Sequence, residues 1–193
     1  MISNYLKIMG NKEEVKEIRN FLIGGPEEAK SGMYIDFRKI KKVPIELKNE
    51  NANINTRLAQ RLLFGGHRNF PTTLEETHEA FMKLDIEVQE ESILSALKYQ
   101  KNLIKYGGEN YFDWTCRNWG TLWTEEWEQE LLAENEILFY TRANDPGHMI
   151  GIVSEKFPDV KIQLETSGDD GVYYKAVFFN GKYEIIEKVV NPY

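Results

Sequence analysis

The sequence has one cysteine and lacks any long apolar run. A single cysteine excludes an internal disulfide, and free thiols are typical of a reducing compartment. A bilayer-spanning helix needs about 20 mostly apolar residues, and no segment approaches that length. The first ten residues, MISNYLKIMG, also lack the basic start and long apolar stretch of a secretory signal peptide. We therefore expect a cytoplasmic protein that does not contact a membrane.

Positive charge is scarce too, since 24 Lys and Arg face 31 Asp and Glu and leave a formal net charge of −7. This balance argues against a dedicated nucleic-acid binder, which neutralises phosphates with Lys and Arg. Residues 1–70 nevertheless carry +5 (13 basic against 8 acidic), and residues 71–193 carry −12 (11 against 23). We favour solvated charge as the explanation, with a basic contact surface as the alternative. That surface would consist of Arg38, Lys39, Lys41, Lys42, Arg57, Arg61 and Arg68.

No group of residues has the spacing of a catalytic or metal site. His67, His78 and His148 lie in unrelated segments without another ligand type, so we predict no metal and no cofactor. Cys116 has Arg117 beside it but no histidine nearby, and a lone buried cysteine is the commoner case. We therefore expect a buried, unreactive thiol and predict no catalytic residue.

The chain begins with a predicted strand and helix. NYLKIMG alternates in the manner of a strand, and KEEVKEIRNFLI places Val15, Ile18 and Leu22 at helical spacing. Gly24-Gly25-Pro26 then ends the helix. The next segment, GMYIDFRKIKKVP, predicts an extended piece that leads into a basic loop.

Residues 54–107 predict three helices. Asn55 or Thr56 is expected to cap the first, and Thr73 with Glu76 forms a capping box for the second. Gly107 closes the third and longest helix, QEESILSALKYQKNLIKYGG. Its expected inward stripe consists of Ile93, Leu97 and Ile104.

After residue 136 the strand period returns. EILFYTR and VKIQLET predict strands, and a helix between them is entered at Pro146. Its inward residues are expected to be Ile150, Val153 and Phe157. Asn180-Gly181 lies between two β-rich runs and predicts a hairpin.

Residues 124–132 are ambiguous. Their Glu, Gln, Leu and Ala favour a helix, whereas Trp127, Gln129 and Leu131 alternate as a strand that pairs with ILFYT. We predict the strand, because it completes a split βαβ order. The fold class is then α+β: a ferredoxin-like antiparallel sheet with a helical insertion and a C-terminal β-hairpin. Residues 1–193 form one domain, with sheet and packing helices at about 1–30 and 120–193 and an insertion at about 45–118.

All four tryptophans lie in the segment YFDWTCRNWGTLWTEEW. Spacing of four would place three of them on one helical stripe, but Gly120 interrupts it. We expect Gly120 to adopt positive φ where the insertion ends, with the tryptophans packed between insertion and sheet. An aromatic platform for a base, sugar or peptide is the alternative. The motif, interpreted as structural, consists of Trp114, Asn118, Trp119, Gly120, Thr121 and Trp123.

Several segments resemble the YubB-like family of uncharacterised phage, plasmid and bacterial proteins. The matching residues are Asn4-x-Leu6-x-Ile8-x-Gly10, Asp36-Phe37-x-Lys39-Ile40 leading to Pro44 and Leu47, Trp114 with Asn118-Trp119-Gly120-Thr121-x-Trp123, and more loosely FYTRANDP, Glu165, Gly168, Asp169 and Gly171. Leu122 departs from the family, which usually has lysine there, and residues 141–146 replace a Thr-Ala-Trp-x-Pro-Pro stretch. The resemblance implies a ferredoxin-like fold with a helical insertion, and it implies no activity.

Three functions follow in order of preference. A non-catalytic protein that binds another protein comes first, because no acid–base pair, nucleophile set or metal cluster is present. Nucleic-acid binding through the basic N-terminal portion comes second. An enzyme of unrecognised mechanism comes third.

Overall fold

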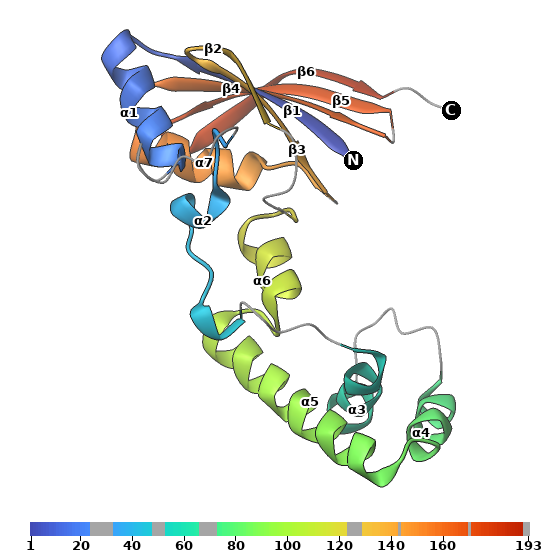
Figure 1. Ribbon diagram of the computed structural model, residues 1–193. Helices are drawn as coiled ribbons and strands as arrows, with labels where there is room; N and C mark the ends of the chain where they lie inside the picture. Colours follow the sequence, from blue (N-terminus) through green and yellow to red (C-terminus); the bar gives the residue numbers. More distant parts are fainter. Residues whose placement is uncertain are drawn as a thin grey trace. The chain divides into compact units, whose positions relative to one another are not determined.

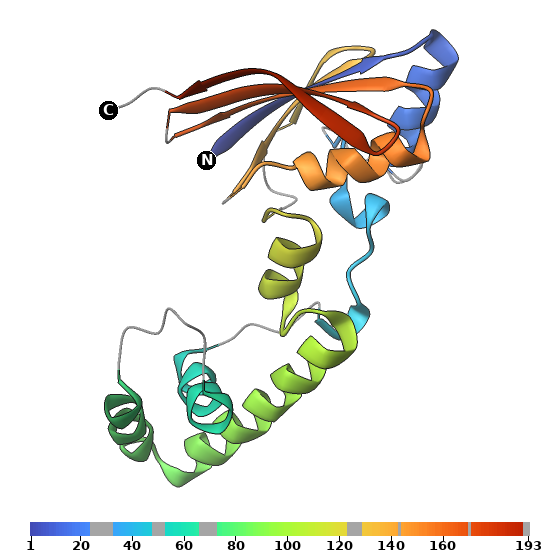
Figure 2. The same ribbon diagram turned by 180° about the vertical axis from the view of Figure 1, so that it is seen from behind.

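The computed structural model describes residues 1–23, 33–47, 53–65, 73–122, 129–142, 144–169 and 171–190. The chain forms two units, of which unit 1 comprises Met1–Lys42 with Thr115–Tyr193 and unit 2 comprises Val43–Trp114. Unit 1 contains the β-strands, and unit 2 contains helices (Figures 1 and 2).

Unit 1 is built on a six-stranded antiparallel sheet with the order β2-β3-β1-β4-β5-β6. The predicted α+β class and antiparallel sheet are therefore confirmed. The first strand, β1, lies between β3 and β4 and pairs with both. The strands are β1 (Ile2–Met9), β2 (Gln129–Ala133), β3 (Glu136–Thr141), β4 (Lys161–Gly168), β5 (Val172–Phe179) and β6 (Lys182–Val190).

Three helices of unit 1 lie on one face of this sheet (Figure 1). They are α1 (Lys12–Ile23), α2 (Phe37–Ile40) and α7 (Gly147–Lys156). Leu6 and Ile8 of β1 are buried toward the helices, whereas Tyr5 and Lys7 alternate with them on the other face and are half-buried. The period of two in the sequence therefore marks the packed side of the sheet.

Two local predictions in unit 1 are confirmed. The helix α7 begins directly after Pro146 and buries Ile150 and Val153, whereas Phe157, which follows its last residue, is half-buried. Asn180 and Gly181 form the turn between β5 and β6 with φ of 48° and 71°. Both signals act over a few residues, so the sequence is sufficient to predict them.

The ambiguous segment is a strand where the structure describes it. The strand β2 begins at Gln129, and Leu131 pairs with Ile137 of β3. Trp127 lies outside the described residues. Pairing with β3 supplies hydrogen bonds that outweigh the helix propensity of Glu, Gln, Leu and Ala.

The described residues of unit 2 form helical elements, and a further helix, α6, has residues in both units. They are a 3₁₀ turn (Ile45–Leu47), α3 (Ile54–Phe64), α4 (Leu74–Met82), α5 (Ile86–Tyr106) and α6 (Tyr111–Asn118). Thr73 and Glu76 form the predicted capping box. The cap of α3, however, is Asn53, whose side chain accepts a hydrogen bond from the Thr56 amide at 2.7 Å. In the described part of the chain, no helix combines the length and apolarity that crossing a bilayer requires.

The predicted inward stripe of α5 is wrong for Leu97 and Ile104, which are exposed, whereas Ile93 is half-buried and packs against the core formed with α3 and α4. The buried residues of this helix are Ser92, Ala96, Tyr99 and Asn102. Ala96 packs in a small core with Leu58, Ala59 and Phe81, which come from α3 and α4. The small side chain of Ala96 lets the helices approach closely at this point, and Leu94, Leu97 and Ile104 fall on the outer face.

Candidate functional site

Trp119 is fully buried in unit 1. Its indole Nε1–H donates to the backbone carbonyl of Lys41 at 2.9 Å, and its ring meets Phe37 edge to face at 6.0 Å between centroids. Gly120 follows with φ of 78°, the positive value that the sequence predicts. A buried indole offers no face on which a ligand could stack, so Trp119 packs the protein interior.

The other residues of the tryptophan motif do not share one environment. Trp114 is buried in unit 2, where its indole N–H donates to the Tyr106 carbonyl at 3.1 Å. Asn118 is half-buried at the end of α6, and Trp123 lies outside the described residues. Cys116 is half-buried, contrary to expectation, because one step along α6 turns it by about 100° from the buried Thr115.

A buried polar network joins segments that are far apart in the sequence. The Asn4 amide of β1 donates to Thr141 Oγ1 at 3.0 Å and accepts from Thr166 Oγ1 at 3.2 Å. The hydroxyls of Thr121 and Thr141 both donate to the Asn144 carbonyl, at 2.6 and 3.0 Å. The network therefore holds the segment that leads into α7, and it links that segment to the residue after Gly120.

A groove of about 610 Å³ lies next to this network, between α7 and the β5–β6 hairpin. Apolar groups of the hairpin line it, including Ala176, Phe178, Tyr183 and Ile185. Polar groups that also line it include Asp145, His148, Glu155 and Lys188. An apolar lining with a few polar groups is typical of a binding site.

The tip of the hairpin is tied to α7, which defines one end of the groove. The Gly181 amide donates to Ser154 Oγ at 3.0 Å, and Ser154 is buried. The rings of Phe178 and Tyr183 stack with centroids 5.5 Å apart. The Asn180-Gly181 turn is evident in the sequence but the groove is not, because only the fold brings the hairpin against α7.

Tyr174 and Asp145 form a half-buried polar pair in the groove. Burial, together with a hydrogen bond to Asp145, raises the pKa of the Tyr174 phenol well above its usual value. Asp145 also accepts from the Gly147 amide at 2.8 Å. A phenol that keeps its proton is suited to donating a hydrogen bond, whereas a base or nucleophile needs a lowered pKa.

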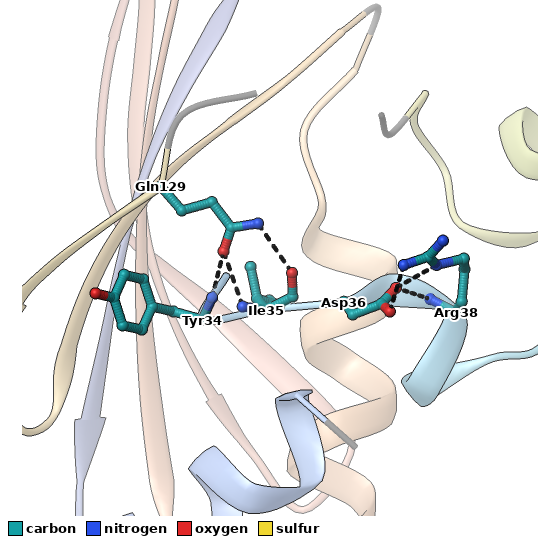
Figure 3. Close-up of polar contacts among 5 residues, drawn as sticks. All are labelled: Tyr34, Ile35, Asp36, Arg38 and Gln129. Atoms are coloured by element: carbon teal, nitrogen blue, oxygen red, sulfur yellow. Dashed lines mark hydrogen bonds and ion pairs between the residues drawn. The ribbon is translucent and has the colours of Figure 1, made fainter. Parts of the chain in front are cut away.

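The candidate basic residues belong to both units. Arg38 donates two hydrogen bonds of 2.8 Å to the buried carboxylate of Asp36 (Figure 3). The carboxylate therefore balances the positive charge of Arg38. Lys39, Lys41 and Lys42 follow in the same segment of unit 1. The remaining candidates are Arg57 and Arg61, which belong to α3 in unit 2, and Arg68, which lies outside the described residues.

Gln129 of β2 holds the segment that precedes Asp36. Its side-chain oxygen accepts from the Tyr34 and Ile35 amides at 2.8 Å each, and its nitrogen donates to the Ile35 carbonyl at 3.0 Å (Figure 3). One amide side chain thus replaces the backbone of an additional strand. From the sequence Gln129 is predicted only as a strand residue, and no local signal distinguishes it.

The remaining candidates for chemistry lie apart. His148 is exposed beside the groove, His78 is exposed on α4 in unit 2, and His67 lies outside the described residues. Within the ranges that the structure describes, no three His, Cys, Asp or Glu side chains form a group that could hold a metal ion.

No family model matches the chain, and no curated protein matches it. The crystal structure of protein api92 from Yersinia pseudotuberculosis, described with the family DUF1281, matches over 100% of this chain and 98% of that chain. The identity is 10% and the TM-score is 0.44. A resemblance at this level carries no inference about fold or function.

Proposed function

We propose that this protein is a non-catalytic binding protein, and that unit 1 recognises an extended segment of another protein along β6. The proposal rests on the position of β6. This strand forms one edge of the sheet (dark red in Figure 2) and lies beside the groove. In the described residues only β5 pairs with it, and all nine of its residues are exposed. An edge strand of this length offers backbone groups to an incoming strand.

Side chains of β6 supply the specificity in this proposal. Tyr183 and Ile185 are 65% and 48% exposed and line the groove on the α7 side. Glu184 lies between Tyr183 and Ile185, and charged side chains on an edge strand limit uncontrolled pairing of edges. A bound segment would add one strand to the sheet and insert an apolar side chain against Phe178 and Tyr183.

The groove chemistry supports binding over catalysis. Tyr174 has a raised pKa and its hydroxyl is hydrogen bonded to Asp145, so this phenol is poorly suited to act as a base or nucleophile near neutral pH. Nucleic-acid binding has less support, because Arg38 is paired with Asp36 and the other cations are distributed over two units.

The order of the elements supports the finer fold and family proposals. The strands β2-β3-β1-β4, with α1 after β1 and α7 after β3, follow the split βαβ order, and β5 and β6 add the hairpin. We propose a ferredoxin-like unit 1 of YubB-like, mobile-element origin in the cytoplasm. This proposal is supported by the hydrogen-bond network that connects Asn4, Thr121 and Thr141. All three residues belong to segments that resemble that family.

Selection from a random peptide library displayed on phage would test the binding proposal with the full chain. We expect enriched peptides whose binding is lost when their backbone amides are N-methylated, because N-methylation removes the strand hydrogen bonds. The variant Ile185→Arg should lose binding, whereas Val189→Arg on the opposite face of β6 should keep it. Equal enrichment on the wild type and Ile185→Arg, or no enrichment at all, would overturn the proposal.

A further inference from the structure

The outer face of α5 carries an exposed apolar stripe. Leu94, Leu97 and Ile104 are 68%, 49% and 78% exposed, and they lie opposite the buried face that contains Ala96. Spacings of three and four residues align them with Glu87, Glu90 and Lys101 in one continuous row. Alternate spacings of three and four are the pattern with which two helices pack along each other.

The sign of the charges in this row changes along the helix. Glu87 and Glu90 precede the two leucines, and Lys101 follows them. The flank repeats the arrangement, with Glu91 before and Lys98 after. The N-terminal half of the face is therefore acidic and its C-terminal half is basic.

We infer that a second copy of this chain binds along this face, with its α5 antiparallel to the first. A twofold axis between residues 95 and 96 places Leu94 of each copy against Leu97 of the other. The same register places each Glu90 against the Lys101 of the other copy, and each Glu91 near Lys98. Each pairing occurs twice, as a twofold interface requires.

A parallel arrangement does not satisfy the same residues. It would place each Glu87, Glu90 and Lys101 against its own equivalent, and opposed like charges disfavour such a pair. The self-complementary charges thus select both the partner, a second copy, and its orientation. This inference concerns unit 2 and is independent of the groove in unit 1.

Charge reversal tests the inference by sedimentation of the full chain over a range of concentrations. The wild type should shift from monomer to dimer as concentration rises, and added salt should weaken the dimer. Glu90→Lys alone and Lys101→Glu alone should each remain monomeric, because each opposes like charges twice. The double variant Glu90→Lys/Lys101→Glu should dimerise again, since it restores opposite charges only in the antiparallel register.

The controls distinguish a loss of dimerisation from a loss of folding. Both positions are exposed, so circular dichroism should show unchanged helix content in every variant. Glu79→Lys, an exposed change on α4, should dimerise like the wild type. A wild type that stays monomeric at the highest concentration, a dimer that tolerates Glu90→Lys, or a double variant that stays monomeric would overturn the inference.

Discussion

The indole N–H of Trp119 donates a hydrogen bond to the backbone carbonyl of Lys41, 78 residues earlier in the chain. Lys41 lies just before unit 2 begins at Val43, and Trp119 lies just after the chain returns at Thr115. One buried side chain therefore holds the outgoing and returning segments together within unit 1. The contact explains why a large aromatic residue occupies this position.

Truncation of Trp119 should destabilise unit 1 strongly. Trp119→Ala removes a fully buried ring, and such changes cost about 3–5 kcal/mol. Trp119→Phe keeps most of the packing but leaves the Lys41 carbonyl without this donor, so a smaller loss of about 1–3 kcal/mol is expected. Chemical denaturation of both variants checks the order. Wild-type stability in Trp119→Ala would contradict a packing role.

Gly120→Ala should destabilise the protein by more than about 1 kcal/mol. Gly120 has φ of 78°, and an added Cβ would lie 3.3 Å from Cβ of His148. Gly151→Ala is the matched control, because that glycine lies inside α7 and an added Cβ meets no atom within 4 Å. There the same change should stabilise by about 0.5–1 kcal/mol. Thermal melts that rank the two variants the other way would contradict this account.

Substitution of Gln129 should release the backbone of Tyr34 and Ile35. Gln129→Leu removes all three hydrogen bonds, so amide hydrogen exchange at both residues should accelerate. Gln129→Glu keeps an oxygen that accepts from the two amides, and its second oxygen replaces the donor to the Ile35 carbonyl. Its exchange rates should stay closer to those of the wild type, and equal acceleration in both variants would count against the clamp.

Glu136, on the strand β3, should contribute stability that depends on pH. Hydrogen bonds from Lys7 and Tyr5 lower the pKa of Glu136. A carboxyl whose pKa is lower in the folded state stabilises above its unfolded pKa, and this contribution is lost as the pH falls through the folded pKa. Glu136→Gln should therefore lower the Tm at pH 7, and the difference from wild type should disappear in acid. A difference that is constant with pH would exclude this linkage.

Several elements follow from the sequence because their signals are local. The Thr73–Glu76 capping box, the Asn180-Gly181 turn and the alternation of β1 each depend on residues a few positions apart. Those interactions form in much the same way whatever the rest of the chain does. The α+β class and the hairpin could thus be predicted with no tertiary information.

Other features are decided by residues that meet only after folding. The strand β2 exists because Leu131 pairs with Ile137, and the buried face of α5 was chosen by close packing at Ala96. The groove requires the Gly181 amide to reach Ser154 across 27 positions of sequence. Periodicity reports that a residue is apolar, but burial depends on which surface arrives opposite it, and only the tertiary structure determines that.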